Sequence, residues 1–533
     1  MLFRHVCRAL LALLPAAAVI SPSLAASTTW NAGTGLWNSA NWSNGLPDAS
    51  TDARIDNNTS INSVVTLSTN AAAASLVLDM NDTLVLGAGA GVTLTTTSIG
   101  NAGKIATGSL YASVSASGIL VNNGILEATG GSTLFLDSQA LVNNGLITAD
   151  APVSGNAAHI VLNHSNSFDG LSVSGAGNIS IADSATLLLE HPVALSTTGW
   201  LDVTGQLQIA APSSLSVGAL HGDYSGSIFS TSSTLSTLFV TNGSASLAFA
   251  GTIGGNLSLV KTGANTLVLD GNNSYTGTTD VYDGCLQLDN PTLTTGGAGL
   301  GNLTVHATAS LSGAGSTLCF TTIQSGAILS PGDWGPGNFT AANSLQLLAN
   351  STLLLDISNA AGSSDFLTIT GGQFSADSVN VQFITHGALT PAKKYPLLNW
   401  TGASIPYPIS AASFHLVNGS AHGFFTVDSN DSTLFFVETV PGDANQDGRI
   451  DLSDVSVVLN NFGKTTSLWT DGNFDGQPSI DLTDLSDVLN GFGTTVNPTV
   501  LPSTANTVPA PEPSSLLVLT PLLFFRRPRM RTR

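Results

Sequence analysis

The sequence predicts a mainly β protein, a parallel β-helix solenoid followed by a small α module of two paired loop-helix units. Three observations lead to this fold class. Charged residues make up only 9% of the 533-residue chain, far below the roughly 25% of an average globular domain. A segment of 21 residues recurs in the N-terminal half, and two acidic loops, each followed by a helical pattern, lie near the C-terminus.

The first element, residues 1–26, has the features of a secretory signal peptide. Two arginines precede an apolar run over residues 9–20, and small residues follow that run. A basic start, a short apolar stretch and a small-residue cleavage site are typical of exported chains. We expect cleavage near Ala25 or Ala26.

Residues 27–440 form the predicted β-helix region. Within it, "IGNAGKIAT", "LVNNGILEA" and "LVNNGLITA" each contain a short apolar strand, an Asn/Gly turn and a second apolar strand. A period near 20 predicts one solenoid coil per repeat, because a single coil cannot bury its apolar face until a neighbour covers it. A β-sandwich array is the alternative, since alternation and turns alone do not fix which strands pair.

The repeat also predicts which residues form the corners of the coils. Asn and Gly tolerate the left-handed backbone region, so we expect them at the turns. The recurring positions are Asn101, Asn122 and Asn143 together with Gly103, Gly124 and Gly145.

Three tryptophans stand at the start of the β region, in "TTWNAGTGLWNSANWSNGLP". Trp30, Trp37 and Trp42 are expected to form a hydrophobic cap over the first coil, a common need of solenoids. An aromatic platform for sugars is the alternative use of the same residues.

Residues 255–288 resemble the autotransporter-associated β-strand repeat. The resemblance implies a β-helix of the kind found in exported passenger domains, and it leaves the ligand open. The pattern is carried by Leu259, Lys261, Gly263, Thr266, Leu267, Leu269, Gly271, Asn273, Tyr275, Thr276, Gly277, Thr279, Val281, Gly284 and Leu286.

Charge and cysteine content limit the partners and the cross-links. The formal net charge is −20, so nucleic acid and anionic membrane surfaces are not expected as partners, whereas cations are. Removal of the signal peptide leaves Cys285 and Cys319. One disulfide and two buried thiols are both open for this pair.

The segment "GDANQDGRIDLSDVSVVLNNFG" contains the pattern of a calcium loop. Calcium takes about six to eight oxygen ligands, and such a loop supplies them at positions 1, 3, 5, 7, 9 and 12. Gly448 provides the sharp turn, and Leu452, Val455, Leu459 and Phe462 follow at helical spacing. The predicted ligands are the side chains of Asp443, Asn445, Asp447, Asp451 and Asp454 and the carbonyl of Arg449.

A second loop, "TDGNFDGQPSIDLTD", has a proline near the place of the turning glycine. Counting back from Asp484 puts Asn473 first and Pro478 at the turn, where its fixed φ opposes the required geometry. Counting forward from Asp471 gives an intact start with two residues inserted. We predict the forward register or a half-filled site, with weaker binding than in the first loop. The predicted ligands are Asp471, Asn473, Asp475, Ser479, Asp481 and Asp484.

Residues 441–493 resemble a type I dockerin, because "DLSDVSVVLNNFG" recurs as "DLTDLSDVLNGFG" and no helix precedes the first loop. The resemblance implies bound Ca²⁺ and docking onto a cohesin-like module. Dockerins recognise partners largely at loop positions 10 and 11, here Leu452–Ser453 and Leu482–Thr483. Leucine at position 10 departs from the Ser/Thr common in members of cellulosomes. An extracellular polysaccharide is the other partner that stays open.

The chain ends in a linker and a tail. Residues 494–513 are rich in Pro, Thr and Ser and cannot pack a core. Residues 508–533 continue with a short apolar run and five arginines, which predict a transient membrane segment with a cytoplasmic tail. They resemble the PEP-CTERM sorting signal at Val508, Pro509, Pro511, Glu512 and Pro513.

This resemblance implies processing by an exosortase-like enzyme and delivery to the cell surface or extracellular matrix of a Gram-negative-type bacterium. A plain C-terminal anchor is the alternative. The sequence contains no His-Glu-x-x-His motif and no Gly-x-Ser-x-Gly elbow. We therefore expect a non-enzymatic surface protein; the alternative is a component that binds or degrades extracellular polysaccharide and joins a complex through the dockerin-like module.

Overall fold

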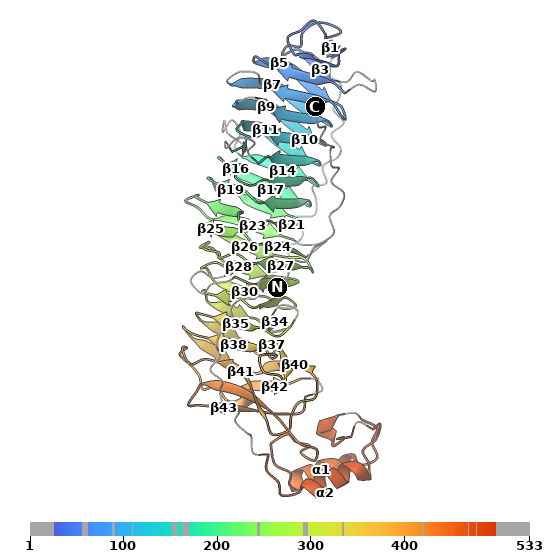
Figure 1. Cartoon of the computed structure of the whole chain (residues 1–533), viewed down its shortest axis with the longest axis vertical. Coiled ribbons are helices and arrows are strands. Elements are labelled where there is room, and N and C mark those ends of the chain that lie inside the picture. Colours follow the sequence, from blue (N-terminus) through green and yellow to red (C-terminus); the bar gives the residue numbers. More distant parts are fainter. Residues whose placement is uncertain are drawn as a thin grey trace, which may run out of the picture.

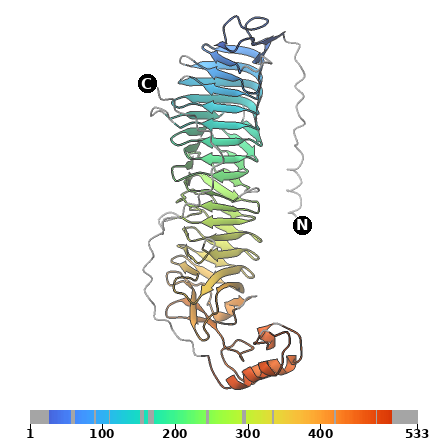
Figure 2. The same ribbon diagram turned by 45° about the vertical axis from the view of Figure 1, so that its right-hand side comes forward.

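A computed structural model of the chain describes residues 26–496, apart from residues 56–61, 88–90, 109, 152–156, 163–169, 242–245, 291–296, 333–334, 418–420, 467 and 476. The described residues form a long, narrow solenoid with two short helices at its C-terminal end (Figures 1 and 2). The predicted signal peptide up to residue 25, and the linker and sorting tail from residue 497 onward, lie outside the described residues.

The strands of the described residues form four sheets. The largest sheet covers two faces of the solenoid, because β11 pairs with β13 along its first half and with β14 along its second half. Its strands are β1 (Ala26–Thr29), β3 (Thr51–Ile55), β5 (Ala71–Leu78), β7 (Val92–Asn101), β9 (Tyr111–Asn122), β11 (Thr133–Asn143), β13 (His159–Leu162), β14 (Leu171–Gly175), β16 (Thr186–Leu189), β17 (Val193–Thr197), β19 (Gln206–Ile209), β20 (Ser214–Val217), β22 (Ser227–Ser230), β23 (Ser236–Val240), β25 (Thr252–Gly255), β26 (Leu257–Lys261), β28 (Thr279–Val281), β30 (Leu303–Val305), β33 (Thr321–Ile323), β36 (Leu345–Leu347) and β39 (Phe374–Ala376).

Two further sheets follow one another along a third face and are linked by a bridge between Gly222 and Phe249. The first contains β2 (Thr34–Leu36), β4 (Val64–Leu67), β6 (Thr83–Leu86), β8 (Lys104–Thr107), β10 (Ile125–Ala128), β12 (Leu146–Ala149), β15 (Asn178–Ile181), β18 (Trp200–Val203) and β21 (Ala219–His221). The second contains β24 (Leu247–Phe249), β27 (Thr266–Leu269), β29 (Cys285–Leu288), β31 (Ser310–Gly313), β34 (Ile328–Pro331), β37 (Thr352–Ser358), β40 (Val379–His386) and β42 (Phe414–Leu416).

The fourth sheet lies at the C-terminal end of the solenoid. It contains β32 (Ser316–Thr317), β35 (Asn338–Ala341), β38 (Phe366–Ile369), β41 (Lys394–Asn399), β43 (Gly423–Asp428) and β44 (Thr433–Glu438). The helical elements are η1 (Ala411–Ser413), α1 (Leu452–Asn461), η2 (Trp469–Asp471) and α2 (Leu482–Gly491).

Pairing within the solenoid is parallel, from β1 with β3 to β40 with β42. Antiparallel pairing between strands occurs where β44 pairs with β41 and β43 at the C-terminal end. The predicted parallel β-helix is thereby confirmed, and the alternative of a β-sandwich array is wrong for the described strands.

The core follows from the alternation of apolar and polar residues along each strand. In β10 and its neighbours, one aliphatic side chain per coil points inward and stacks on the equivalent residue of the next coil. Burying each such side chain stabilises the fold by about 1.5–3 kcal/mol. The buried column consists of Leu84, Ile105, Leu126, Ile147, Ile179 and Leu201.

The period of 21 residues corresponds to a buried ladder of asparagine amides. Asn101 donates from Nδ2 to Oδ1 of Asn122 over 2.7 Å, and Asn122 donates in the same way to Asn143 over 2.8 Å. The same amides reach the carbonyls of Ile125 and Leu146 in the next coil. All three asparagines are buried, so the ladder explains why the sequence repeats in register here.

The prediction that the repeated Asn and Gly residues occur because they tolerate the left-handed backbone region is wrong. Gly103, Gly124 and Gly145 do not have positive φ, and neither do the asparagines of the ladder. Glycine is required instead because consecutive coils stack closely: a Cβ on Gly124 would lie 1.9 Å from the Gly103 carbonyl oxygen. A Cβ on Gly145 would meet the Gly124 carbonyl oxygen at 2.0 Å.

The N-terminal coil is closed by the three tryptophans. Trp30 and Trp37 pack edge-on against Trp42, with ring centroids 5.3 and 4.9 Å away. All three rings are buried, and the Trp42 indole donates to the Trp37 carbonyl. The residues form a hydrophobic cap, and burial prevents them from serving as a sugar platform.

The segment that resembles the autotransporter-associated β-strand repeat contains a fully buried lysine, Lys261. Its ammonium group donates to the carbonyls of Thr262, Gly263 and Asp283 over 2.8, 2.7 and 3.1 Å. Burial lowers the pKa of Lys261 from 10.5 to about 8. The lysine thus joins two consecutive coils through their backbone.

This buried lysine predicts a pH dependence of stability. Between about pH 8 and 10.5 the unfolded chain keeps a proton on Lys261 that the folded chain has released. The free energy of unfolding therefore rises with pH in this window, by at most about 1.4 kcal/mol per pH unit. Urea denaturation at several pH values should show the rise in the parent protein and not in a Lys261→Met variant; equal pH slopes in both would contradict the assignment.

Both remaining cysteines are free thiols. Cys319 is buried, and burial raises the pKa of its thiol to about 11. Cys285 is half-buried and lies 3.1 Å from the Ser312 hydroxyl. The structure therefore shows the thiol alternative and not the disulfide.

Candidate metal centre

Two loop-helix units of the same design lie at the end of the solenoid. Helix α1 (Leu452–Asn461) begins after Asp451, whose carboxylate accepts a hydrogen bond from the Ser453 N–H over 2.8 Å. Asp454 completes a capping box by accepting from the Asp451 N–H over 2.9 Å. Predicted ligand positions 9 and 12 therefore also start the helix. The second unit repeats these bonds with Asp481, Thr483 and Asp484.

The first loop folds around two fully buried carboxylates. Asp443 accepts hydrogen bonds from the N–H groups of Asp447 and Gly448, over 3.1 and 3.0 Å. Asp454 accepts from the Asn445 N–H over 3.1 Å. Gly448 has φ of 84°, which makes the turn that brings these groups around one centre.

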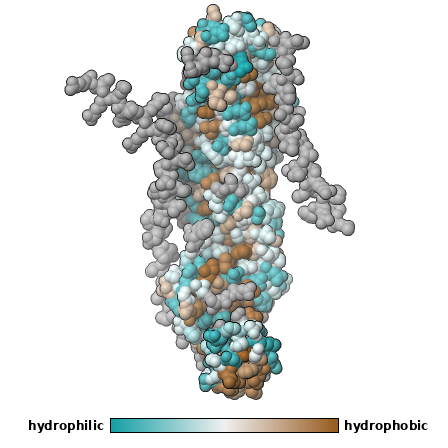
Figure 3. Space-filling model, turned by 90° about the vertical axis from the view of Figure 1, so that its right-hand side faces the viewer, coloured by the Kyte–Doolittle hydropathy of each residue, from teal (hydrophilic) through white to brown (hydrophobic). Residues whose placement is uncertain are grey.

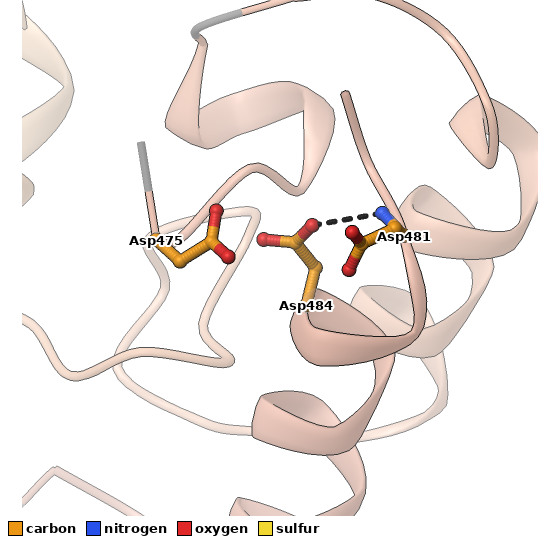
Figure 4. A group of neighbouring side chains, drawn as sticks. All are labelled: Asp475, Asp481 and Asp484. Carbon is orange, nitrogen blue, oxygen red and sulfur yellow. Dashed lines mark hydrogen bonds between the residues drawn. The ribbon is translucent and has the colours of Figure 1, made fainter. Parts of the chain in front are cut away.

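The second loop brings three carboxylates together (Figure 4). Asp475, Asp481 and Asp484 each offer an oxygen within 4.8 Å of the others. Asp484 is buried and the other two are exposed. Asp484 also accepts a hydrogen bond from the Phe474 N–H over 2.7 Å.

The backbone of the module fixes the register of this loop. Ile450 exchanges hydrogen bonds with the chain after α2, and Ile480 makes the same exchange with the chain after α1. A constant offset of 30 residues therefore places Asn473 where the first loop has Asp443. Asp471 lies outside the three-carboxylate cluster, and its carboxylate accepts from the Thr466 hydroxyl over 2.9 Å. The contacts follow the register counted back from Asp484 and not the forward register that starts at Asp471; the half-filled site, the other alternative, stays a prediction.

This register makes the second loop the poorer set of ligands. Pro478 occupies the position of Gly448 and has no N–H to donate to the first-position side chain. Gln477 occupies the position of Asp447, and Asn473 that of Asp443. The second loop thus offers carboxylates from Asp475, Asp481 and Asp484, the amides of Asn473 and Gln477, and the Ser479 carbonyl.

The electrostatics of the loops suit a divalent cation. Burial, with the neighbouring Asp454 and Asp447 carboxylates, raises the pKa of Asp443. Burial and the charges of nearby Asp484 and Asp475 likewise raise the pKa of Asp487 beside the second loop. Crowded carboxylates with additional amide and carbonyl oxygens are the ligands that Ca²⁺ prefers. The residues present therefore fit calcium.

The helices bury a small core and leave a larger apolar surface outside. The core of the module consists of Ala444, Ile450, Val458, Phe474, Ile480 and Val488. Of Leu452, Val455, Leu459 and Phe462, which follow one another at helical spacing, only Val455 packs against this core, and only partly. The exposed apolar face, as we call it, consists of Leu452, Leu459, Phe462, Leu482, Leu489 and Phe492.

This face is duplicated with the same 30-residue offset. Leu452 and Leu482 are 71% and 72% exposed, and Leu459 and Leu489 are 55% and 57% exposed. Hydrophobic surface gathers at the end of the molecule that carries the helices (Figure 3). The repeated "VLNNFG" and "VLNGFG" were the signal for it in the sequence, although helical spacing alone did not show which side faces solvent.

Few structural observations bear on the predicted sorting signal and membrane segment. The sorting residues Pro509, Pro511, Glu512 and Pro513 lie outside the described residues. Of the helices in the described part of the chain, none has the length and apolar character needed to cross a membrane.

Comparison with known proteins adds one match. Residues 259–288 match the family described as "Passenger-associated-transport-repeat", in agreement with the resemblance that the same segment shows in the sequence. A search of curated proteins finds no match to the chain. The repeat and the β-helix together indicate an exported, surface-displayed protein.

Proposed function

We propose that the protein is a non-enzymatic component of the cell surface or extracellular matrix. In this proposal the β-helix is a stalk, and residues 441–493 are a calcium-stabilised, dockerin-like module that docks onto a partner. An exosortase-like enzyme would process the tail at the Pro-Glu-Pro site. The observation that carries the proposal is the pair of loop-helix units, with two buried carboxylates in the first loop, one in the second and apolar side chains outside both.

The outer surface of the solenoid supports the role of a stalk. Along one face, Ser172, Ala194, Ser214 and Thr237 stand in register on successive coils. Such a row of small side chains offers neither a pocket nor a cluster of acids for cleaving a polysaccharide. The three-carboxylate cluster found in the described residues belongs to the second loop and not to this face.

The exposed apolar face supports docking. Contiguous exposed apolar surface on a monomer commonly marks a protein interaction site. The surrounding module is acidic and has few basic residues, Arg449 and Lys464. A partner would therefore present an apolar surface with neutral or basic surroundings, as a cohesin-like module could.

Docking can be tested by recovering partners from the native envelope, with and without a calcium chelator. We expect a calcium-dependent partner, and we expect a Leu459→Ser, Leu489→Ser variant to lose it, because the interface would remove both exposed leucine side chains from water. Leu300→Ser is the control, since Leu300 is 51% exposed on the solenoid. Recovery that is independent of calcium, or equal loss in the control, would contradict docking through this face.

A further inference from the structure

The first loop is joined to the solenoid more directly than a flexible module would require. Only a few residues separate the end of β44 (Thr433–Glu438) from Asp443. Within this connection Thr439 makes hydrogen bonds to both the solenoid and the loop. Its N–H donates to the His422 carbonyl over 2.7 Å, and its hydroxyl donates to the Asp443 carboxylate. The solenoid thus contacts the first predicted calcium ligand.

Two residues inside the first loop contact β43, a strand of the last hairpin of the solenoid. Gln446, held at φ of 60°, accepts a hydrogen bond at Oε1 from the Gly423 N–H over 3.1 Å. Gly448 lies so close to Phe424 that an added Cβ would be 2.7 Å from its ring. The turn of the loop is therefore pressed against the stalk.

Trp469 completes the junction from the segment between the two loops. Its ring stacks on His422 of the solenoid, with centroids 4.3 Å apart and planes 12° apart. Its indole N–H donates to the Asp443 carbonyl over 2.8 Å. Trp469 therefore bonds to the backbone of the first predicted ligand while resting on the stalk.

The second loop contrasts with the first. The hydrogen bonds described for the carboxylates of Asp475, Asp481 and Asp484 are all made to residues of the module itself. An open pocket of about 490 Å³ also lies at the junction, lined by Ala392 of the solenoid, by Val440 of the connection and otherwise by residues of the module such as Ile450. The orientation of the module thus depends on the contacts of the first loop.

We propose that calcium in the first loop locks the orientation of the docking module on the stalk. The inference rests on the proposed calcium binding. A cation held by Asp443, Asp447 and Asp454 fixes the turn that carries Gln446 and Gly448, and with it their contacts to β43. Without a cation the crowded carboxylates repel each other, the turn opens, and the module moves relative to the solenoid. Calcium in the second loop has no such effect.

The test is small-angle X-ray scattering of the mature protein with calcium and with chelator. We expect chelation to broaden the distribution of interatomic distances in the parent protein. A Gln446→Gly variant relieves the positive φ while removing the bond to Gly423, so it should give the broad distribution even with calcium, with calcium binding retained in calorimetry. Trp469→Phe, which keeps the stacking and loses the indole bond, should act in the same direction.

Asp475→Asn is the control, because it weakens only the second loop and should leave the calcium-dependent scattering unchanged. If the parent protein binds calcium but scatters identically with and without it, the locking inference is overturned and the proposed function stands. If the protein binds no calcium at all, both fail.

Discussion

A Gly124→Ala variant is expected to destabilise the first coils by about 3 kcal/mol, the upper part of the usual range for overpacking. The new Cβ would lie 1.9 Å from the Gly103 carbonyl oxygen. That neighbour is backbone, so it cannot rotate away as a side chain would. Relief requires the coils to separate, which breaks the adjacent ladder at Asn122.

The measurement for this variant is hydrogen exchange of peptides that cover residues 101–146, because solenoids lose structure locally and not in one step. Gly100→Ala is the matched control, since nothing lies within 4 Å of its added Cβ and its φ is ordinary. In the control, the free energy of local opening measured by hydrogen exchange should change by less than about 0.5 kcal/mol. Equal protection in the two variants would show that the coils do not stack as described.

Asp454→Ala is expected to abolish calcium binding in the first loop and to loosen the start of α1. The residue is fully buried and accepts from the N–H groups of Asn445 and Asp451. Calcium at a hundredfold excess over its Kd contributes about 2.7 kcal/mol, and loss of the Asp454 half of the capping box adds about 1 kcal/mol. Thermal unfolding followed by differential scanning calorimetry should show a calcium-dependent shift in the parent protein that the variant lacks.

Asp431→Ala removes the same charge from an exposed turn between β43 and β44. It should keep the full calcium-dependent shift. If Asp454→Ala behaves like this control, Asp454 is not a ligand and the first loop is not a calcium site.

The sequence indicates the solenoid well where the coils copy one another. Asn122 must face Asn101 and Asn143 for its amide to be satisfied, so its spacing has to match the length of the coil. Later coils need only an aliphatic residue at each inward position, and Ile179 or Leu201 can fill it equally. The repeat in the sequence fades there although the strands continue in register.

The sequence cannot show why glycine recurs at Gly124. A position with positive φ and a position that stacks closely on another backbone both require glycine, so the residue type does not distinguish them. It also cannot show the junction, since Trp469 and His422 are distant in the chain and meet only in the folded protein. The register of the second loop depends in the same way on backbone pairing at Ile480. Local ligand spacing favoured Asp471 as the start, but pairing between the two units decides otherwise.

The most direct test of the central claim is a calorimetric titration of the mature protein with calcium. We expect two calcium ions per chain, the tighter one in the first loop, because that loop has four carboxylates and Gly448 at its turn whereas the second has three and Pro478. Absence of calcium binding, or two sites of equal affinity, would contradict this account.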